Sequence, residues 1–201
     1  MNYTDFGIKH YQLDDDDAQI MRNTLLDSED IILGLGKSAF NYPEDQTLGK
    51  LHFYNLFIGI EAWAGHGLPF LKRILSDYLQ LKSGEPIKIK SWANILRNGQ
   101  SVQKHSHTDA VSMGTVSGNL YLGSDVPTET MFIINGEEVG IPNRFGEFTL
   151  FPSQYLHWVP PYEGECRVAA AFDACATMRE KRIWGNMDGI SPKVWYNYRA
   201  T

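Results

Sequence analysis

The sequence is poor in cysteine, with only two among its 201 residues. Cys166 and Cys175 lie nine positions apart, and the chain has no CxxC pair or Cys/His spacing typical of zinc sites. Neither a disulfide framework nor a structural zinc site is therefore indicated, and both residues are expected to be buried free thiols. A chain of this length can bury a sizeable core without cross-links. We therefore expect residues 1–201 to form a single domain around one core.

The sequence also has fewer positive than negative charges: it contains 18 Lys and Arg residues and 24 Asp and Glu residues, which gives a net charge of -6. Nucleic acid is unlikely as the main partner, since its phosphates are bound by an excess of basic residues. The sequence lacks the roughly 20 consecutive apolar residues that span a bilayer, and its start lacks the basic and apolar segments of a signal peptide. These absences favour a cytoplasmic protein without a membrane partner.

Helical periodicity is confined to the first part of the chain. Between Ile60 and Leu81 apolar residues recur at spacings of three and four, which predicts an amphipathic helix beyond Pro69. A weaker pattern predicts another helix over residues 18–26, after the solvated acidic start at Asp14 to Asp17. We expect residues 1–86 to form a helical support.

Beyond Pro86 the pattern changes to short apolar runs separated by turn signals such as Asn98-Gly99 and Asn135-Gly136. These runs predict strands over residues 87–96, 118–122, 130–134, 148–151 and 167–172. Helices followed by many short strands are typical of a sandwich or barrel with helices packed on one face. We expect a β core over residues 87–175 and a C-terminal extension over 176–201.

A group of basic residues precedes the histidines described below: Lys88, Lys90, Arg97 and Lys104. They could attract an acidic substrate or simply form a solvated strand edge. The strand-edge interpretation is favoured, because runs of charge usually mark solvated faces.

Two segments carry residues suited to binding a metal. His107 and Asp109 form an H-x-D pair in QKHSHTDA, and His157 follows a Phe-Pro turn in FPSQYLHWVPP. Residues i and i+2 of an extended segment point to the same face, so an imidazole and a carboxylate two positions apart can reach one ion. Two histidines and one carboxylate leave positions on ferrous iron open for a cosubstrate and dioxygen.

Arg167 lies ten residues beyond His157, at the start of another predicted strand. If a short hairpin joins the two strands, Arg167 can point inward, where its guanidinium matches a carboxylate bidentately. In isolation, His157 could be a core imidazole, His107 and Asp109 a surface pair, and Arg167 an ordinary strand residue. Their joint order and spacing favour a metal site that binds a dicarboxylate cosubstrate.

Three segments together carry a family resemblance: WANILRNGQSVQKHSHTDA, SGNLYLGSDV and GEFTLFPSQYLHWVPPYEGECRVAAAFD. They resemble successive core strands of Fe(II)/2-oxoglutarate-dependent oxygenases, especially bacterial and phage oxygenases related to prolyl 4-hydroxylases. The resemblance covers roughly residues 88–175. It implies a mainly β fold with flanking helices, the double-stranded β-helix or cupin-like jelly roll. It also implies Fe(II) as cofactor and 2-oxoglutarate as cosubstrate, and brings ascorbate into consideration as a reductant.

The resemblance assigns His107, Asp109 and His157 as the catalytic iron ligands, and Arg167 as the residue that binds the distal carboxylate of 2-oxoglutarate. Many relatives have Ser or Thr two residues after the basic residue, whereas this chain has Ala169. Another donor must then complete the carboxylate site, or the cosubstrate binds less tightly.

Tyr121 and Asn94 are weaker candidates for cosubstrate contacts. Tyr121 lies in the strand after the H-x-D segment, and Asn94 shares strand parity with Trp92. His105 and Trp158 are expected to face the substrate or to support the ligands.

Two alternatives stay open. His105 could replace Asp109 in a three-histidine dioxygenase that does not use 2-oxoglutarate, or the chain could be a cupin-like protein that binds metal without turnover. The leading prediction is an enzyme that couples oxidative decarboxylation of 2-oxoglutarate to hydroxylation. Its partners would be dioxygen and a peptidyl prolyl or other side chain, or a small metabolite. The sequence leaves the substrate and the oligomeric state undetermined.

Overall fold

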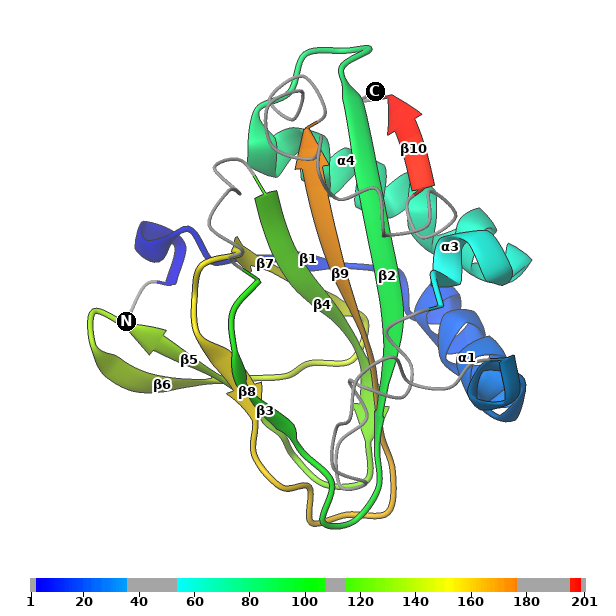
Figure 1. The fold of residues 1–201 in the computed structure, drawn as a ribbon, viewed down its shortest axis with the longest axis vertical. Coiled ribbons are helices and arrows are strands. Elements are labelled where there is room, and N and C mark those ends of the chain that lie inside the picture. The colour runs from blue at the N-terminus through cyan, green and yellow to red at the C-terminus, as the bar shows by residue number, and fades with distance from the viewer. Residues whose placement is uncertain (1–2, 36–53, 108–114, 177–195, 200–201) are drawn as a thin grey trace.

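The computed structural model describes residues 3–35, 54–107, 115–176 and 196–199, which form two antiparallel sheets and a layer of helices (Figure 1). The major sheet contains, in spatial order, β1 (Lys9–Gln12), β7 (Glu147–Pro152), β4 (Thr115–Ser124), β9 (Arg167–Ala176), β2 (Pro86–Leu96) and β10 (Tyr196–Arg199). The minor sheet contains β3 (Val102–His105), β8 (His157–Val159), β5 (Glu129–Ile134) and β6 (Glu137–Pro142).

The chain passes repeatedly between the two sheets, because β2, β4, β7 and β9 lie in the major sheet whereas β3, β5, β6 and β8 lie in the minor sheet. This alternation is the double-stranded β-helix, or jelly roll, in which two sheets enclose an interior. The predicted fold class is therefore confirmed. Figure 1 shows α1 and α3 on the opposite side of the major sheet from the minor sheet.

The helices begin near the residues that the sequence indicates. Helix α1 (Asp15–Leu35) starts after Asp14, whose Oδ1 accepts a hydrogen bond from the Asp16 backbone N–H at 2.9 Å. It extends well beyond the predicted range 18–26. The amphipathic helix predicted beyond Pro69 is α4 (Leu68–Leu79). It has Pro69 in its first turn, where a missing N–H is tolerated. No helix in the described part of the chain is long and apolar enough to cross a membrane.

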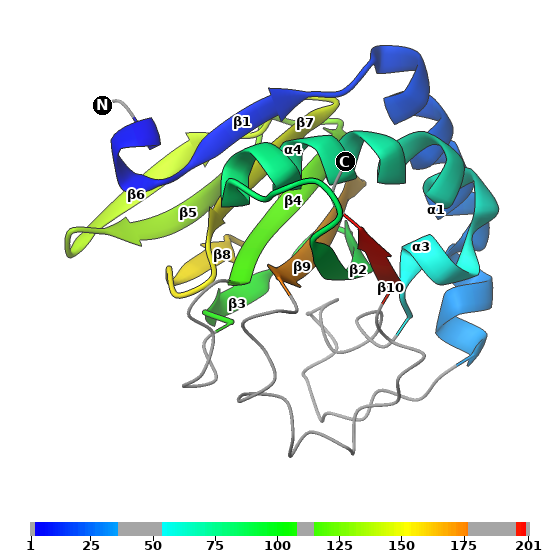
Figure 2. The same ribbon diagram turned by 90° about the horizontal axis from the view of Figure 1, so that it is seen from above.

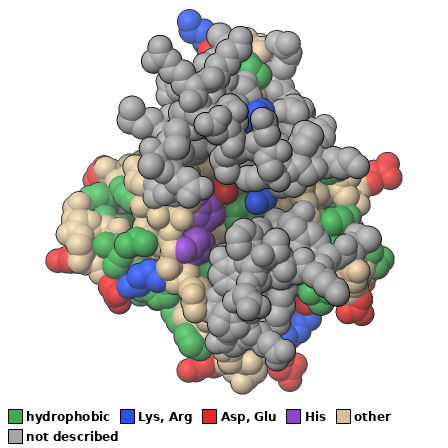
Figure 3. Space-filling view, in the orientation of Figure 1, with side chains coloured by type: hydrophobic (Ala, Val, Ile, Leu, Met, Phe, Trp, Pro, Cys, Tyr) green, Lys and Arg blue, Asp and Glu red, His purple; other side chains and the backbone are tan. Residues whose placement is uncertain are grey.

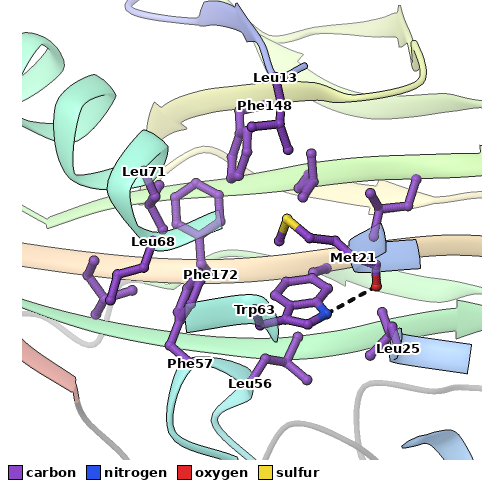
Figure 4. Packing of buried hydrophobic residues seen from close by; sticks show 14 of the residues in the cluster. Leu13, Met21, Leu25, Leu56, Phe57, Trp63, Leu68, Leu71, Phe148 and Phe172 are labelled. Atoms are coloured by element: carbon purple, nitrogen blue, oxygen red, sulfur yellow. Dashed lines mark hydrogen bonds between the residues drawn. The ribbon is translucent and has the colours of Figure 1, made fainter. Parts of the chain in front are cut away.

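Shorter helical segments complete the support: the 3-10 helix η1 (Tyr3–Phe6), the short helix α3 (Leu56–Gly59) and the π-helical turn η2 (Trp63–Gly67). Figure 2 shows α1, α3 and α4 as one group beside the major sheet. Their apolar side chains form the main core with the outer face of that sheet, where Trp63 Nε1 donates to the backbone carbonyl of Met21 at 3.1 Å (Figure 4). This packing leaves the other face of the sheet to form the interior of the β-helix.

All five predicted strands are present, as β2, β4, β5, β7 and β9. The Asn135-Gly136 signal is also confirmed, since both residues have positive φ in the tight turn between β5 and β6. The sequence analysis missed β1, β3, β6, β8 and β10. Of these, β1 and β10 lie outside the expected core range 87–175, yet both pair with strands of the major sheet.

The two cysteines are free thiols, as expected; Cys175 is buried, whereas Cys166 is half-buried beside Arg97.

Candidate metal centre

Strand β9 lies in the middle of the major sheet and sets which residues face the interior. It pairs with β2 on one side and with β4 on the other. Because successive side chains of a strand point to opposite faces, Arg167, Ala169 and Ala171 line the interior cavity, while Val168 and Phe172 pack in the helix-covered core. The first residue of β9 therefore contributes a buried guanidinium to the cavity wall.

Three histidines meet at the cavity wall formed by the minor sheet. His105 ends β3 and lies opposite His157, the first residue of β8. His107 follows β3, and its backbone N–H donates to the Ser153 carbonyl at 2.9 Å. One ring nitrogen from each histidine lies within 4.8 Å of those of the other two. Figure 3 shows histidine side chains at the centre of one face, with acidic and basic side chains beside them.

The hydrogen bonds of the three rings define their tautomers. Each Nδ1 lies next to an oxygen that can only accept: Gln103 O for His105 at 2.7 Å, Asp173 Oδ1 for His107 at 2.5 Å, and Tyr155 O for His157 at 2.9 Å. Each Nδ1 therefore carries a proton, which leaves a lone pair on Nε2 of His105 and His157, the two rings whose pKa is lowered.

The Nε2 atoms of His105 and His107 are 3.1 Å apart. A protonated His107, whose pKa is raised, would donate from Nε2 to His105 across this distance, and a metal held by both rings would take the place of that proton. Two nitrogen ligands about 2.1 Å from one metal and at right angles to each other would be about 3 Å apart. The spacing and the tautomers thus fit a bound transition metal.

Burial sets the protonation of these rings. It lowers the pKa of His157 to about 3, an effect that His105 and His107 reinforce. Burial likewise lowers the pKa of His105. Burial also opposes the charged form of His107, but the charge and hydrogen bond of Asp173 outweigh it and raise the pKa of His107. At neutral pH, His105 and His157 are therefore neutral and available as ligands.

Asp173 is a site residue that the sequence analysis missed. Its Oδ1 accepts from His107 Nδ1 and also from Ser117 Oγ at 2.7 Å, and Ser117 Oγ in turn contacts Ser153 Oγ at 2.9 Å. A carboxylate behind a histidine ligand fixes the ring and makes its other nitrogen a stronger ligand. The sequence contained one indication of this role. Asp173 is six residues after Arg167, an even spacing that places both side chains on the same face of a strand.

Arg167 is almost completely buried, with 1% of its surface exposed. In the described part of the chain, its Nε and Nη1 have no hydrogen-bond partner. The guanidinium lies 5.5 Å from the centre of the Tyr121 ring. Burial lowers the pKa of Arg167 to about 10, so it remains a cation at neutral pH. The missing partner for this buried cation is an anion, and a carboxylate fits its geometry.

Comparison with solved structures gives the fold a family context. A Pseudomonas putida prolyl-4-hydroxylase matches with a TM-score of 0.61 at 14% identity, over 87% of this chain and 95% of that protein. A prolyl hydroxylase from Trichoplax adhaerens, in complex with a hypoxia inducible factor peptide fragment, matches with a TM-score of 0.64 at 14% identity, over 88% and 87%. The alpha-ketoglutarate-dependent epimerase SnoN matches with a TM-score of 0.61 at 15% identity, over 88% and 80%.

The fold is the one that these oxygenases share. The resemblance seen in the sequence is thus confirmed at the level of the fold. Two comparisons of the sequence itself, with models of protein families and with curated proteins, find no match.

The structure also places the three weaker site candidates, Asn94, Tyr121 and Trp158. Asn94 lies opposite Ala169 and lines the cavity. The Tyr121 hydroxyl bonds Ser124 Oγ, so Tyr121 meets Arg167 with its ring. Trp158 also lines the cavity, and Lys104 Nζ lies 3.9 Å from the centre of its ring.

Asp109 lies outside the described residues, as does His52. Two other histidines pair with carboxylates away from the cavity: His10 with Glu147 and His66 with Asp17.

The strand-edge interpretation of Lys90 is wrong. Strand β2 lies between β9 and β10 in the major sheet, so it is not an edge strand. Lys90 is half-buried, and burial lowers its pKa. It shares the face of β2 that Trp92 and Asn94 present to the cavity.

Proposed function

We propose that this protein is an Fe(II)/2-oxoglutarate-dependent oxygenase that hydroxylates a peptide side chain or a small metabolite. His107, Asp109 and His157 would hold the iron, and Arg167 would bind the distal carboxylate of 2-oxoglutarate. The observation that carries the proposal is the buried Arg167, two of whose nitrogens have no partner among the described residues, in a cavity that also reaches the histidine cluster.

The energetics of Arg167 support a dicarboxylate cosubstrate. A buried cation without a partner costs several kcal/mol, even after relaxation of its surroundings. A carboxylate could accept from two guanidinium nitrogens at once and remove most of this cost. Ala169 and Ala171 line the cavity on the same strand as Arg167, and neither side chain can donate or accept a hydrogen bond. The missing Ser or Thr at position 169 thus removes one donor.

The protein would contribute ligand geometry and exclusion of water. Ferrous iron with a bound keto acid supplies the activation of dioxygen that hydroxylation requires. The hydrogen bonds from each Nδ1 hold the three imidazoles in place and leave each Nε2 as the ligand atom. The fold of the prolyl hydroxylases and of SnoN is consistent with this chemistry, but their substrates differ, so the fold alone does not select one.

A three-histidine dioxygenase that does not use 2-oxoglutarate is the second candidate. It is favoured by His105, whose Nε2 lies 3.1 Å from that of His107 and whose Nδ1 is held by a backbone carbonyl. In this case Asp109 would be dispensable for metal binding, and His105 would not.

The test is an anaerobic titration of Fe(II)-loaded protein with 2-oxoglutarate, followed by the visible charge-transfer band of a keto acid on ferrous iron. We expect a saturable band in the wild type, no band in His157→Ala, and a greatly weakened one in Arg167→Ala. Arg144→Ala is the matched control, because this arginine is exposed on the surface. Absence of a band in wild-type protein shown to contain iron would overturn the proposal.

Iron content separates the two candidates. Asp109→Ala should lose iron, and His105→Ala should retain most of it, if the two-histidine, one-carboxylate site is correct. The opposite pattern would establish the three-histidine site.

A further inference from the structure

The indole of Trp92 is a buried donor that has no acceptor among the described residues. Its side chain is 3% exposed and lines the cavity, and within the described ranges Nε1 has no hydrogen-bond partner. The ring stacks on His107, with centroids 5.7 Å apart and an interplanar angle of 25°. Leaving a buried N–H unpaired costs about 1–3 kcal/mol. An acceptor that enters the cavity beside the histidine cluster would remove this cost.

Lys90 places a positive charge next to the same indole. It lies two residues before Trp92 on β2, and its Nζ is 5.2 Å from the centre of the Trp92 ring. Lys90 Nζ forms no hydrogen bond or ion pair with any residue of the described ranges. Asp173 lies opposite Lys90 on β9 and attracts it, while the Asp173 Oδ1 accepts from His107 and Ser117. Within the described residues, the ammonium is therefore attracted by a carboxylate but donates to no atom.

The two donors lie away from Arg167 along the strands. Register pairs Leu96 with Arg167, Trp92 with Ala171 and Lys90 with Asp173. Six strand positions, or about 20 Å of backbone, separate the row of Arg167 from the row of Lys90. Arg167 thus lines the cavity, while Lys90 lies farther along the face of β2 that carries Trp92, the residue that stacks on His107.

We propose that Lys90 and Trp92 form a subsite for a carboxylate group of the substrate. This inference rests on the proposed function, because it places the oxygenated substrate beside the metal centre and leaves Arg167 to the cosubstrate. The ammonium supplies charge and the indole N–H supplies direction, as in other charge-assisted recognition of carboxylates. The substrate class is then a small molecule with a carboxylate near the reacting carbon, in preference to an uncharged peptide segment.

The test uses acetate as the simplest carboxylate probe and acetamide as its neutral match. Zn(II)-loaded protein is saturated with 2-oxoglutarate, and the indole N–H resonance of Trp92, assigned by its loss in Trp92→Phe, is followed by NMR. We expect acetate to shift this resonance saturably and acetamide to leave it unchanged. Lys90→Met should raise the acetate Kd at least tenfold, whereas Lys90→Arg should keep it within about threefold.

Lys88→Met is the matched control, since Lys88 is on the same strand two residues away and should change the acetate Kd less than twofold. No acetate shift in the wild type, or an unchanged Kd in Lys90→Met, would overturn the subsite. A Lys90-dependent shift caused by 2-oxoglutarate alone, which acetate then reverses, would assign both donors to the cosubstrate and overturn the substrate assignment.

Failure of the proposed function is distinguishable from failure of the subsite. The acetate titration involves no turnover and can be repeated without 2-oxoglutarate. If no 2-oxoglutarate binding is detected but the Lys90-dependent acetate shift persists, the subsite stands and the 2-oxoglutarate reaction is rejected.

Discussion

The two faces of the major sheet are built from the same strands but serve opposite purposes. On β9, Val168 and Phe172 pack into the helix-covered core, while the alternating positions place Arg167, Ala171 and Asp173 toward the cavity. The first face contains apolar side chains that need no hydrogen bonds. The second contains a buried guanidinium and a carboxylate, and two nitrogens of Arg167 have no partner in the part of the chain that the structure describes.

This difference separates stability from binding. Burial of apolar surface on the helix-covered face is the main stabilising contribution to the fold. The cavity face lowers stability, because polar groups are removed from water before any ligand pairs with them. Substitutions on the two faces should therefore change different measurements, even when the residues are neighbours in sequence.

The largest effect on stability is expected from Phe172→Ala. Phe172 is 1% exposed, and its ring lies 5.7 Å from that of Phe148 in the main core. Loss of a buried aromatic side chain should lower the free energy of unfolding by roughly 3–5 kcal/mol. Urea denaturation measures this value, and zinc affinity measured below the transition should be unchanged. A large change in zinc affinity would show that the two faces are not independent.

Arg167→Met should have the opposite signature. The 2-oxoglutarate Kd should rise at least about 30-fold, since loss of a buried charge-assisted pair costs about 2–5 kcal/mol. The ligand-free protein should be as stable as the wild type or more stable, because an unpaired buried cation has been replaced by an apolar side chain of similar length. Thermal unfolding with and without 2-oxoglutarate tests both parts. A clear loss of stability in the ligand-free variant would mean that Arg167 has a structural partner.

Asp173→Asn should weaken metal binding by about 10–100-fold, because the asparagine no longer supplies the charge that supports His107. Competition with a chelator under zinc loading measures the change. Ser117→Ala removes only the hydrogen bond that positions Asp173 and should have a smaller effect. Equal effects of the two substitutions would show that the position of the carboxylate, and not its charge, is what His107 requires.

The smallest effect is a pH dependence of the metal-free protein. The pKa of His157 is about 3 in the folded state, below its usual value near 6.5, so the folded state favours the neutral ring. The folded protein is therefore most stable, with respect to this group, above pH 6.5, and it loses stability as the pH falls toward 3. The loss at pH 5 is about 2 kcal/mol. His157→Gln should flatten the decline in unfolding free energy between pH 7.5 and 5. His105 adds a change of the same sign, whereas the raised pKa of His107 opposes it.

The sequence predicted the longer elements and the key residues of the cavity. Strands such as β2 and β9 carry strong patterns, and the spacing of His107, His157 and Arg167 could be recognised without coordinates. Strands β3 and β8 have only four and three residues, too few for a periodic signal. Their pairing nevertheless brings His105 opposite His157, a long-range contact that local patterns do not encode.

Two other features depended on knowing which face of a strand is the interior. Asp173 lies in an apolar run of the sequence. It can be assigned to the cavity face of β9 only once Arg167, which shares that face, is known to point into the cavity. Lys90 was assigned to a strand edge because runs of charge usually mark solvated faces. The pairing of β10 with β2, which makes β2 an inner strand, joins residues more than 100 positions apart and is not visible in local patterns.

The central position of β9 also limits how this chain can change in length. Its residues pair on both sides, so inserting or deleting one residue within the strand would exchange its two faces. Arg167 would then enter the apolar core or Val168 would enter the cavity, and both regions would fail together. Changes in length are better tolerated in surface turns, such as Asn135-Gly136, than within this strand. Evolution of new substrate preferences on this scaffold would therefore proceed by substitution along β9 and by length changes elsewhere.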